Sequence, residues 1–418
     1  MTPGARQRAH LVVGLVAVVA AGGVVPLGPA AVAAEVACAP GTTTYVPDAP
    51  PALARLAGEA AWRTATGAGV VVAVVDSGVD AGNAHLVDAV LPGVDLVGAD
   101  GDPAGLTDTD GHGTAVAGQI AARAVPGSGV VGLAPEAMVL PVRVFVADDE
   151  QAVRDGVGPR ADRVAAGIRH AADHGARVVN VSMSTTEDSP ELRSAVQDAT
   201  RAGALVVASV GNRGASGAAA DSPRYPAAYP EVLAVTAVDD ADQPAEGAAR
   251  GAHVGVAAPG TNVLTTYHAA GDCMLAGDQA STSFATAYVS AAAALLVERY
   301  PEETPAQWRH RLEATAARVQ PAERDDQVGW GLIRPDLALA FVDDGSAAGP
   351  GSPVHRRPAT ASDAVEHVVV EVRADPLATT RGVGAWWTLG GLTAVLLAVL
   401  VARLGGTRRR RQARASSS

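Results

Sequence analysis

Short apolar segments rich in β-branched residues alternate with helical patterns through the middle of the chain. Each short segment is apolar at consecutive positions, which is typical of a strand covered on both faces. The predicted strands are residues 70–75, 139–144, 177–183, 204–209 and 232–238. Helices are predicted at 161–174 and 190–202, each ended by a glycine. This order predicts an α/β fold with a doubly wound, mostly parallel sheet flanked by helices.

Each end of the chain carries an apolar run next to arginines. Residues 1–34 predict a signal peptide, because Arg6 and Arg8 precede an apolar run and small residues follow it near Ala34. An uncleaved anchor is the alternative.

The second apolar run, residues 382–402, contains 21 residues without a charge. At roughly 1.5 Å per residue it would span about 30 Å, the thickness of a bilayer core. Trp386 and Trp387 lie at its start and the arginine-rich residues 403–418 follow it. The pattern predicts one transmembrane helix in the cell membrane, with an extracytoplasmic domain and a cytoplasmic C-terminus. A buried core helix is the alternative, which the length and the basic tail disfavour.

Between these ends we expect a short arm, one large domain and a linker. The arm is residues 35–60, the domain is residues 61–342, and the linker is residues 343–381, which begin with a stretch rich in Gly, Pro, Ser and Ala. An apolar helix inside the domain should begin at Ser283 and end near Tyr300, before a proline.

The charge and the cysteines narrow the class of protein. The net charge of −12 persists although arginines gather at both termini, so the basic surface of a nucleic-acid-binding protein is absent. Two cysteines are too few for a disulfide scaffold or a structural zinc site. In an exported protein they predict one bridge, Cys38–Cys273, with two unpaired thiols as the alternative.

Three segments far apart in the chain carry residues for nucleophilic chemistry. Asp76 follows a predicted strand, His112 stands between two glycines, and Ser283 begins the long apolar helix. A serine hydroxyl becomes a strong nucleophile when an imidazole accepts its proton and a carboxylate orients that imidazole. Each residue alone could be a helix cap or a turn residue. Together, in this order, they predict a catalytic triad for acyl transfer.

The order Asp, His, Ser is that of the subtilisin arrangement. The segments DSGVD, GHGTAVAG and TSFAT resemble the signature blocks of the subtilases, and the resemblance extends over residues 61–340. A short arm, a subtilase domain, one anchor and a basic tail resemble the mycosins, the membrane-anchored subtilases of type VII secretion systems. The segments VGLAPEAMVLPVRVF and SFATAYVS are also similar to mycosin sequence.

This resemblance implies roles for residues outside the triad. Asn212 matches the asparagine that donates its side-chain amide to the oxyanion. Two short segments match the walls of the substrate cleft, where substrate would add as an extended strand. The matching residues are Ser182, Met183 and Ser184 on one wall, and Ser209, Val210 and Gly211 on the other. Ser184 replaces the usual glycine, so we expect a narrow pocket that favours small side chains at the cleaved position.

The resemblance also implies a function and its partners. We expect a serine endopeptidase that cleaves exported proteins near the membrane and associates with subunits of a type VII secretion system. A scaffold with dispensable activity is the alternative, because Ser281 and Ala287 replace a glycine and a proline of the family pattern. A degradative enzyme released to the medium is a third hypothesis, which the anchor disfavours.

No cofactor is expected, and calcium is the one metal that the sequence leads us to consider. Residues 98–111 contain four aspartates, Asp100, Asp102, Asp108 and Asp110. Their spacing does not match a known calcium loop, so we interpret the segment as a solvated acidic loop, with structural calcium as the alternative.

Overall fold

The computed structural model describes residues 38, 42–98, 102–213, 221–268, 271–355 and 386–400. The chain divides into two compact units, residues 1–357 and 358–418. The predicted signal peptide, the basic tail and the second part of the predicted linker lie outside the described residues.

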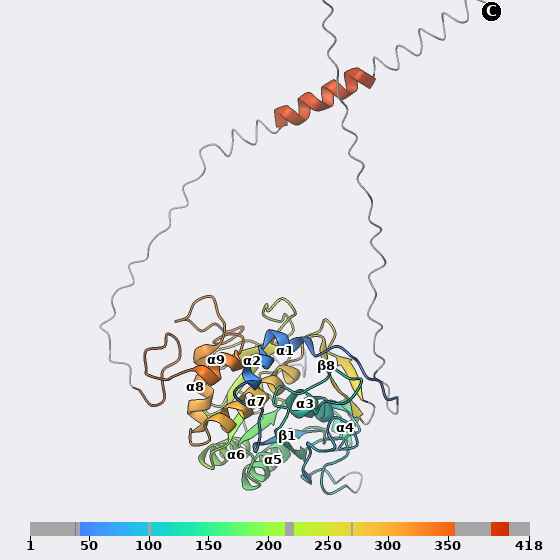
Figure 1. Ribbon diagram of the computed structural model, residues 1–418. Helices are drawn as coiled ribbons and strands as arrows, with labels where there is room; N and C mark the ends of the chain where they lie inside the picture. Colours follow the sequence, from blue (N-terminus) through green and yellow to red (C-terminus); the bar gives the residue numbers. More distant parts are fainter. Residues whose placement is uncertain are drawn as a thin grey trace, which may run out of the picture. The chain divides into compact units, whose positions relative to one another are not determined.

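A seven-stranded sheet forms the centre of the first unit (Figure 1). Its strand order is β2-β3-β1-β4-β5-β6-β7, and every neighbouring pair is parallel. The strands are β1 (Val71–Asp76), β2 (Val94–Asp95), β3 (Met138–Arg143), β4 (Val178–Val181), β5 (Leu205–Ser209), β6 (Leu233–Val238) and β7 (Val256–Pro259). The predicted doubly wound parallel sheet is therefore confirmed, while β2 and β7 were not predicted. An antiparallel pair, β8 (Val263–Thr266) and β9 (Asp272–Leu275), was also not predicted.

Helices cover both faces of the sheet. They are α1 (Pro51–Arg55), α2 (Gly58–Trp62), α3 (His112–Ala121), α4 (Glu150–Arg154), α5 (Ala161–Asp173), α6 (Pro190–Arg201), α7 (Thr282–Arg299), α8 (Pro305–Thr315) and α9 (Pro335–Ala340). Figure 1 shows β1 between α5 and α6 below it and α3 and α7 above it. Alternate residues of β1 serve the two sides: Val72 and Val74 pack in the core with α3 and α7, whereas Ala73 and Val75 pack with α5 and α6. Burial on both faces explains why the strands are apolar throughout.

Helix α7 is the central helix of the upper layer. It contacts β4, β5, β6 and β7, and its residues from Thr282 to Val297 are buried. The run of alanines lets the helix lie close to the sheet, and the helix ends at Arg299, before Pro301, as predicted. Its first turn, at Thr282 and Ser283, lies at the carboxyl ends of β4 and β5, because Ser182 and Ser209 make hydrogen bonds to it.

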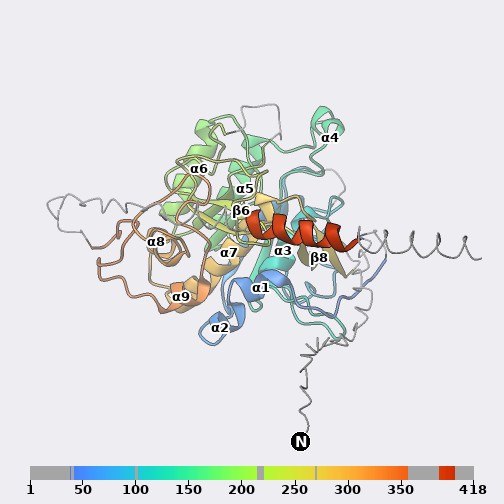
Figure 2. The ribbon, with the colours of Figure 1, turned by 90° about the horizontal axis from the view of Figure 1, so that it is seen from above.

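A disulfide and a hydrogen-bonded carboxylate hold the N-terminal arm. Cys38 is bonded to Cys273 of β9, as predicted. Next to it, Asp272 Oδ2 accepts hydrogen bonds from Val46 N at 2.7 Å and from Ser128 Oγ at 2.6 Å. Helix α2 lies beside α9, and α1 packs against α2 and β8, at the edge of the unit opposite α6 (Figure 2). The predicted boundary between arm and domain, at residue 61, therefore falls inside α2, because the arm contributes to the core.

The predicted linker begins as part of the first unit. Arg318 Nη2 donates to the carbonyl of Ala348 at 3.0 Å, and Ser352 Oγ donates to Asp343 at 2.6 Å. The first unit therefore extends beyond residue 342, the predicted end of the domain, to residue 357. In the second unit, residues 386–400 form a helix, while the rest of the predicted transmembrane segment 382–402 lies outside the described residues. Among the described residues, no helix combines the length and the apolarity needed to cross a membrane.

Candidate active site

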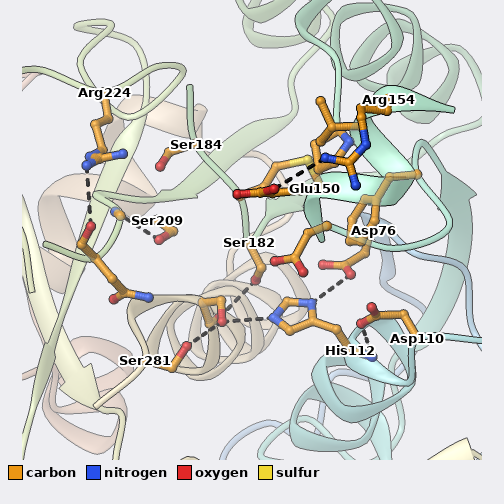
Figure 3. Close-up of a pocket in the computed structure, with 18 residues that line it drawn as sticks. Asp76, Asp110, His112, Glu150, Arg154, Ser182, Ser184, Ser209, Arg224 and Ser281 are labelled. Carbon is orange, nitrogen blue, oxygen red and sulfur yellow. Dashed lines mark hydrogen bonds and ion pairs between the residues drawn. The ribbon is translucent and has the colours of Figure 1, made fainter. Parts of the chain in front are cut away.

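Three side chains from β1, α3 and α7 meet at the carboxyl edge of the sheet. His112 Nδ1 lies 2.7 Å from Asp76 Oδ1, and His112 Nε2 lies 2.9 Å from Ser283 Oγ. Figure 3 shows the imidazole of His112 between the two oxygens. Since parallel strands end at one edge and the helices α3 and α7 begin there, residues 36 and 171 positions apart come within hydrogen-bonding distance.

The glycines on both sides of His112 are required by close packing inside the protein. Gly111 has φ +92°, and a Cβ there would lie 2.3 Å from the ring of Tyr267. A Cβ on Gly113 would lie 2.0 Å from the carbonyl oxygen of Gly78. The glycines therefore let α3 begin against β1 and the loop at Tyr267.

The carboxylate of Asp76 is fixed from two directions. Its side chain is fully buried, and its Oδ1 accepts a second hydrogen bond, from Ser77 N at 2.8 Å. The hydroxyl of Ser77 accepts from Gly113 N at 2.9 Å. This bond ties the first turn of α3 to the end of β1, so it fixes His112 relative to Asp76.

Neighbouring carboxylates control the charge of His112. Burial lowers the pKa of the imidazole, but Asp76, Asp110 and Asp108 together raise the pKa to about 9. Burial, opposed by His112, raises the pKa of Asp110 itself to about 6. Above pH 6 the Asp110 carboxylate is therefore charged and favours protonated His112.

These pKa values predict an alkaline activity profile. A protonated imidazole cannot accept the proton of Ser283, so kcat/KM should be low below the pKa of His112 and rise through about pH 9. Replacing Asp110 with asparagine removes one of the carboxylates that raise this pKa, so the midpoint should move to lower pH. The measurement is kcat/KM for a peptide substrate between pH 5 and 11. Glu150→Gln, which changes another carboxylate of the cleft, is the matched control and should leave the midpoint unchanged. An unchanged midpoint in Asp110→Asn would contradict this electrostatic account.

A chain of hydrogen bonds holds the backbone of Ser283. Ser182 Oγ donates to the carbonyl oxygen of Ser283 at 2.9 Å and accepts from Asn180 Nδ2 at 2.9 Å. Asn180 Oδ1 in turn accepts a hydrogen bond at 2.8 Å from Ser290 Oγ, which lies further along α7. Strand β4 and helix α7 are thus joined through buried polar groups, and the first turn of α7 cannot shift without breaking them.

The side chain of Asn212 is oriented by Thr282. Asn212 Oδ1 accepts from Thr282 N at 3.2 Å and from Thr282 Oγ1 at 3.0 Å. Because the oxygen end is held there, the amide Nδ2 is the end left to face the cleft that Asn212 lines. The Thr282 hydroxyl also lies 2.7 Å from Ser209 Oγ, so the residue before Ser283 joins α7 to β5.

A cleft of about 990 Å³ runs past these side chains. Five of the six residues predicted for its walls line it, namely Ser182, Met183, Ser184, Ser209 and Gly211. Val210 does not line the cleft, because its side chain is fully buried in the core between the sheet and α5 and α6. Arg224, which sequence reasoning missed, also lines it: the residue is distant in sequence and only folding brings it beside Gly211.

The acids of the predicted acidic loop bind backbone groups where the structure describes them. Asp108 accepts from Gly111 N at 2.8 Å and from Thr114 N at 2.8 Å, and Asp102 accepts from Thr107 N at 2.8 Å. Asp100 lies outside the described residues. Within the described ranges, no group of three or more His, Cys, Asp or Glu side chains could hold a metal ion.

A parallel sheet that brings Asp, His and Ser together at its carboxyl edge, in this chain order, defines a subtilisin-like serine protease. The comparisons with known proteins agree. The model of the subtilase family, Peptidase_S8, matches residues 67–331, and the chain belongs to this family.

Among its relatives are mycosins. Mycosin-1 of Mycobacterium tuberculosis is 36% identical over 69% of this chain and 73% of that protein. Fervidolysin of Fervidobacterium pennivorans is 35% identical over 66% of this chain, which spans only 42% of fervidolysin. A solved structure, that of MycP1 from the ESX-1 type VII secretion system, matches with a TM-score of 0.63 and 31% identity, covering 76% of this chain and 93% of the other.

Proposed function

We propose that this serine protease is an endopeptidase that cleaves exported proteins through an acyl-enzyme formed on Ser283. In this mechanism His112 Nε2 accepts the hydroxyl proton as Ser283 Oγ attacks the peptide carbonyl, and returns a proton to the leaving amine. Asp76 orients the imidazole through Nδ1 and stabilises its protonated form. The observation that carries the proposal is the position of His112 between the carboxylate and the hydroxyl, at 2.7 and 2.9 Å.

Two donors would stabilise the oxyanion of the tetrahedral intermediate. One is the Asn212 amide, whose orientation by Thr282 supports the role. The other is the backbone N–H of Ser283, in the first turn of α7, where N–H groups have no partner within the helix. Such donors are effective because they are already oriented before charge develops.

The walls of the cleft support a preference for small side chains at the cleaved position. A Cβ on Gly211 would lie 2.6 Å from Ser184 Oγ and 2.5 Å from Arg224 Cδ, so these two side chains fill the space beside Gly211. An extended substrate lying between the 182–184 and 209–211 segments would meet a narrow pocket there.

Replacing Ser184 with glycine should widen this pocket. We expect kcat/KM for peptides with Leu or Phe at the cleaved position to rise about tenfold relative to those with Ala, since the site gains room for added methylene groups. A peptide library profiled with wild type, Ser184→Gly and Ser346→Gly, an exposed serine outside the cleft, measures this change. A wild-type preference for Phe or Arg would contradict the narrow pocket.

The substrates and partners are proposed from the relatives and from the ends of the chain. A solved relative is described as an essential component of the type VII (ESX-1) secretion system, and we propose the same setting for this chain. The apolar residues 382–402, followed by the arginines of 403–418, support anchoring in the cell membrane with the protease domain outside. Exported proteins near the membrane would then be the substrates, and secretion subunits the partners.

A serine-directed fluorophosphonate probe tests the central proposal. Incubation with the purified protein should label it at one site per chain, and mass spectrometry of the digested product should place the label on Ser283. Prior heat denaturation, which separates the three side chains, should abolish labelling. Absence of labelling in the folded protein, or a label on another residue, would refute the proposed mechanism.

A further inference from the structure

Ser281 lies at the point where the family pattern has glycine, and the backbone does not require glycine there. Its φ of −113° and ψ of 120° are ordinary extended values that any residue adopts. The residue is the N-cap of α7, and it lines the catalytic cleft. The serine therefore adds a hydroxyl to the site without straining the chain.

This hydroxyl does not do what an N-cap serine usually does. A capping serine accepts a hydrogen bond from the N–H of the second or third helical residue, which here are Ser283 and Phe284. Ser281 makes no such bond. Its Oγ lies instead 2.6 Å from Ser283 Oγ, and Figure 3 shows Ser281 on the other side of that oxygen from His112. The N–H of Ser283 is thereby left for the oxyanion.

The number of hydrogens at Ser283 Oγ decides the direction of this bond. The hydroxyl of Ser283 has one proton, which it must donate to His112 Nε2 for general-base catalysis. When His112 is neutral, the proton between the two serines must therefore belong to Ser281. Ser283 Oγ then donates to His112 and accepts from Ser281.

We propose that Ser281 is a further catalytic residue, which donates a hydrogen bond to Ser283 Oγ and stabilises the negative charge that develops on that oxygen. The inference rests on the proposed function of Ser283 as the nucleophile. Charge develops on Ser283 Oγ as its proton moves to His112, and again when this oxygen leaves the acyl group during deacylation. Ser281 keeps its own proton in both steps. A hydrogen bond to a charged oxygen is stronger than one to a neutral hydroxyl, so the contribution is larger in the transition states than in the resting enzyme.

The test removes the hydroxyl and then restores it. In the full-length protein, Ser281→Ala and Ser281→Gly should lower kcat and kcat/KM for a peptide substrate by the same factor, about tenfold, with KM unchanged, as expected for an interaction made in the transition state. The rate of labelling by the fluorophosphonate probe, which also reacts at Ser283 Oγ, should fall by the same factor. Ser281→Thr keeps a hydroxyl and should remain within about twofold of wild type.

The outcomes separate this inference from the proposed function. If wild type reacts with the probe at Ser283 while Ser281→Ala is as fast as wild type, the inference on Ser281 is wrong and the proposed function stands. The inference is also wrong if Ser281→Thr is as slow as Ser281→Ala, or if only KM or the melting temperature changes, because a structural role would give those results. If wild type does not react with the probe, both are wrong.

Discussion

Replacing Ser283 with alanine is expected to lower kcat for peptide hydrolysis by about a millionfold, because the acyl-enzyme can no longer form. His112 and the oxyanion donors remain in the variant, so a small residual rate above that of water should persist. The measurement is the release of a fluorogenic peptide product by purified protein at pH 10 to 11, above the pKa of His112 of about 9. Ser194→Ala, an exposed serine of α6, is the matched control and should keep full activity.

The same variant separates the two functions that the sequence left open. In cells, Ser283→Ala should abolish processing of an exported substrate if the protein acts as a protease. If secretion and processing both continue in cells that carry only Ser283→Ala, the scaffold function is correct and the proposed one is not. Equal abundance of the variant and wild type in whole-cell extracts controls for loss of the protein.

Replacing Asn212 should have the second-largest effect. We expect Asn212→Ala to lower kcat by about 10²- to 10³-fold, which corresponds to roughly 3–4 kcal/mol of lost stabilisation of the oxyanion. KM should change little, because the charge exists only after attack on the carbonyl. Steady-state kinetics with a peptide amide measures both constants.

A second substitution tests whether the amide itself is responsible. Asn212→Asp keeps an oxygen that can accept both hydrogen bonds from Thr282, but it replaces the Nδ2 donor with a second oxygen. Its kcat should be at least as low as that of Asn212→Ala. If Asn212→Asp retains the activity of wild type, Asn212 acts by holding Thr282 and not by donating to the oxyanion.

The triad and the main strands could be predicted because their signals are local. A strand buried on both faces must be apolar at consecutive positions, so β1, β3, β4, β5 and β6 were visible in the sequence. Strands β8 (VLTT) and β9 (DCML) contain polar residues and have no continuous apolar run, so they gave no comparable signal. Asp76 follows a predicted strand and Ser283 begins a predicted helix, whereas His112 was marked by its two flanking glycines. The topology brings all three to one edge of the sheet.

Other features of the site depend on which residues meet after folding. Val210 neighbours two residues of the cleft in sequence, yet its side chain points into the core. Position 113 requires glycine because a Cβ there would clash with the carbonyl oxygen of Gly78, 35 residues earlier in the chain. Arg224 lines the cleft from a loop that contains no recognisable motif.

The sequence by itself determined the fold class, the order of the three reactive residues and the subtilase resemblance, because periodicity and short motifs are properties of neighbouring positions. Only the tertiary structure decided how each polar group is used. Ser281 could have capped α7 or faced the nucleophile, and both are compatible with its place in the sequence. In the folded protein Ser281 Oγ faces the nucleophile and lies 2.6 Å from Ser283 Oγ. The packing of α7 against β4 and β5 holds the two hydroxyls at this distance.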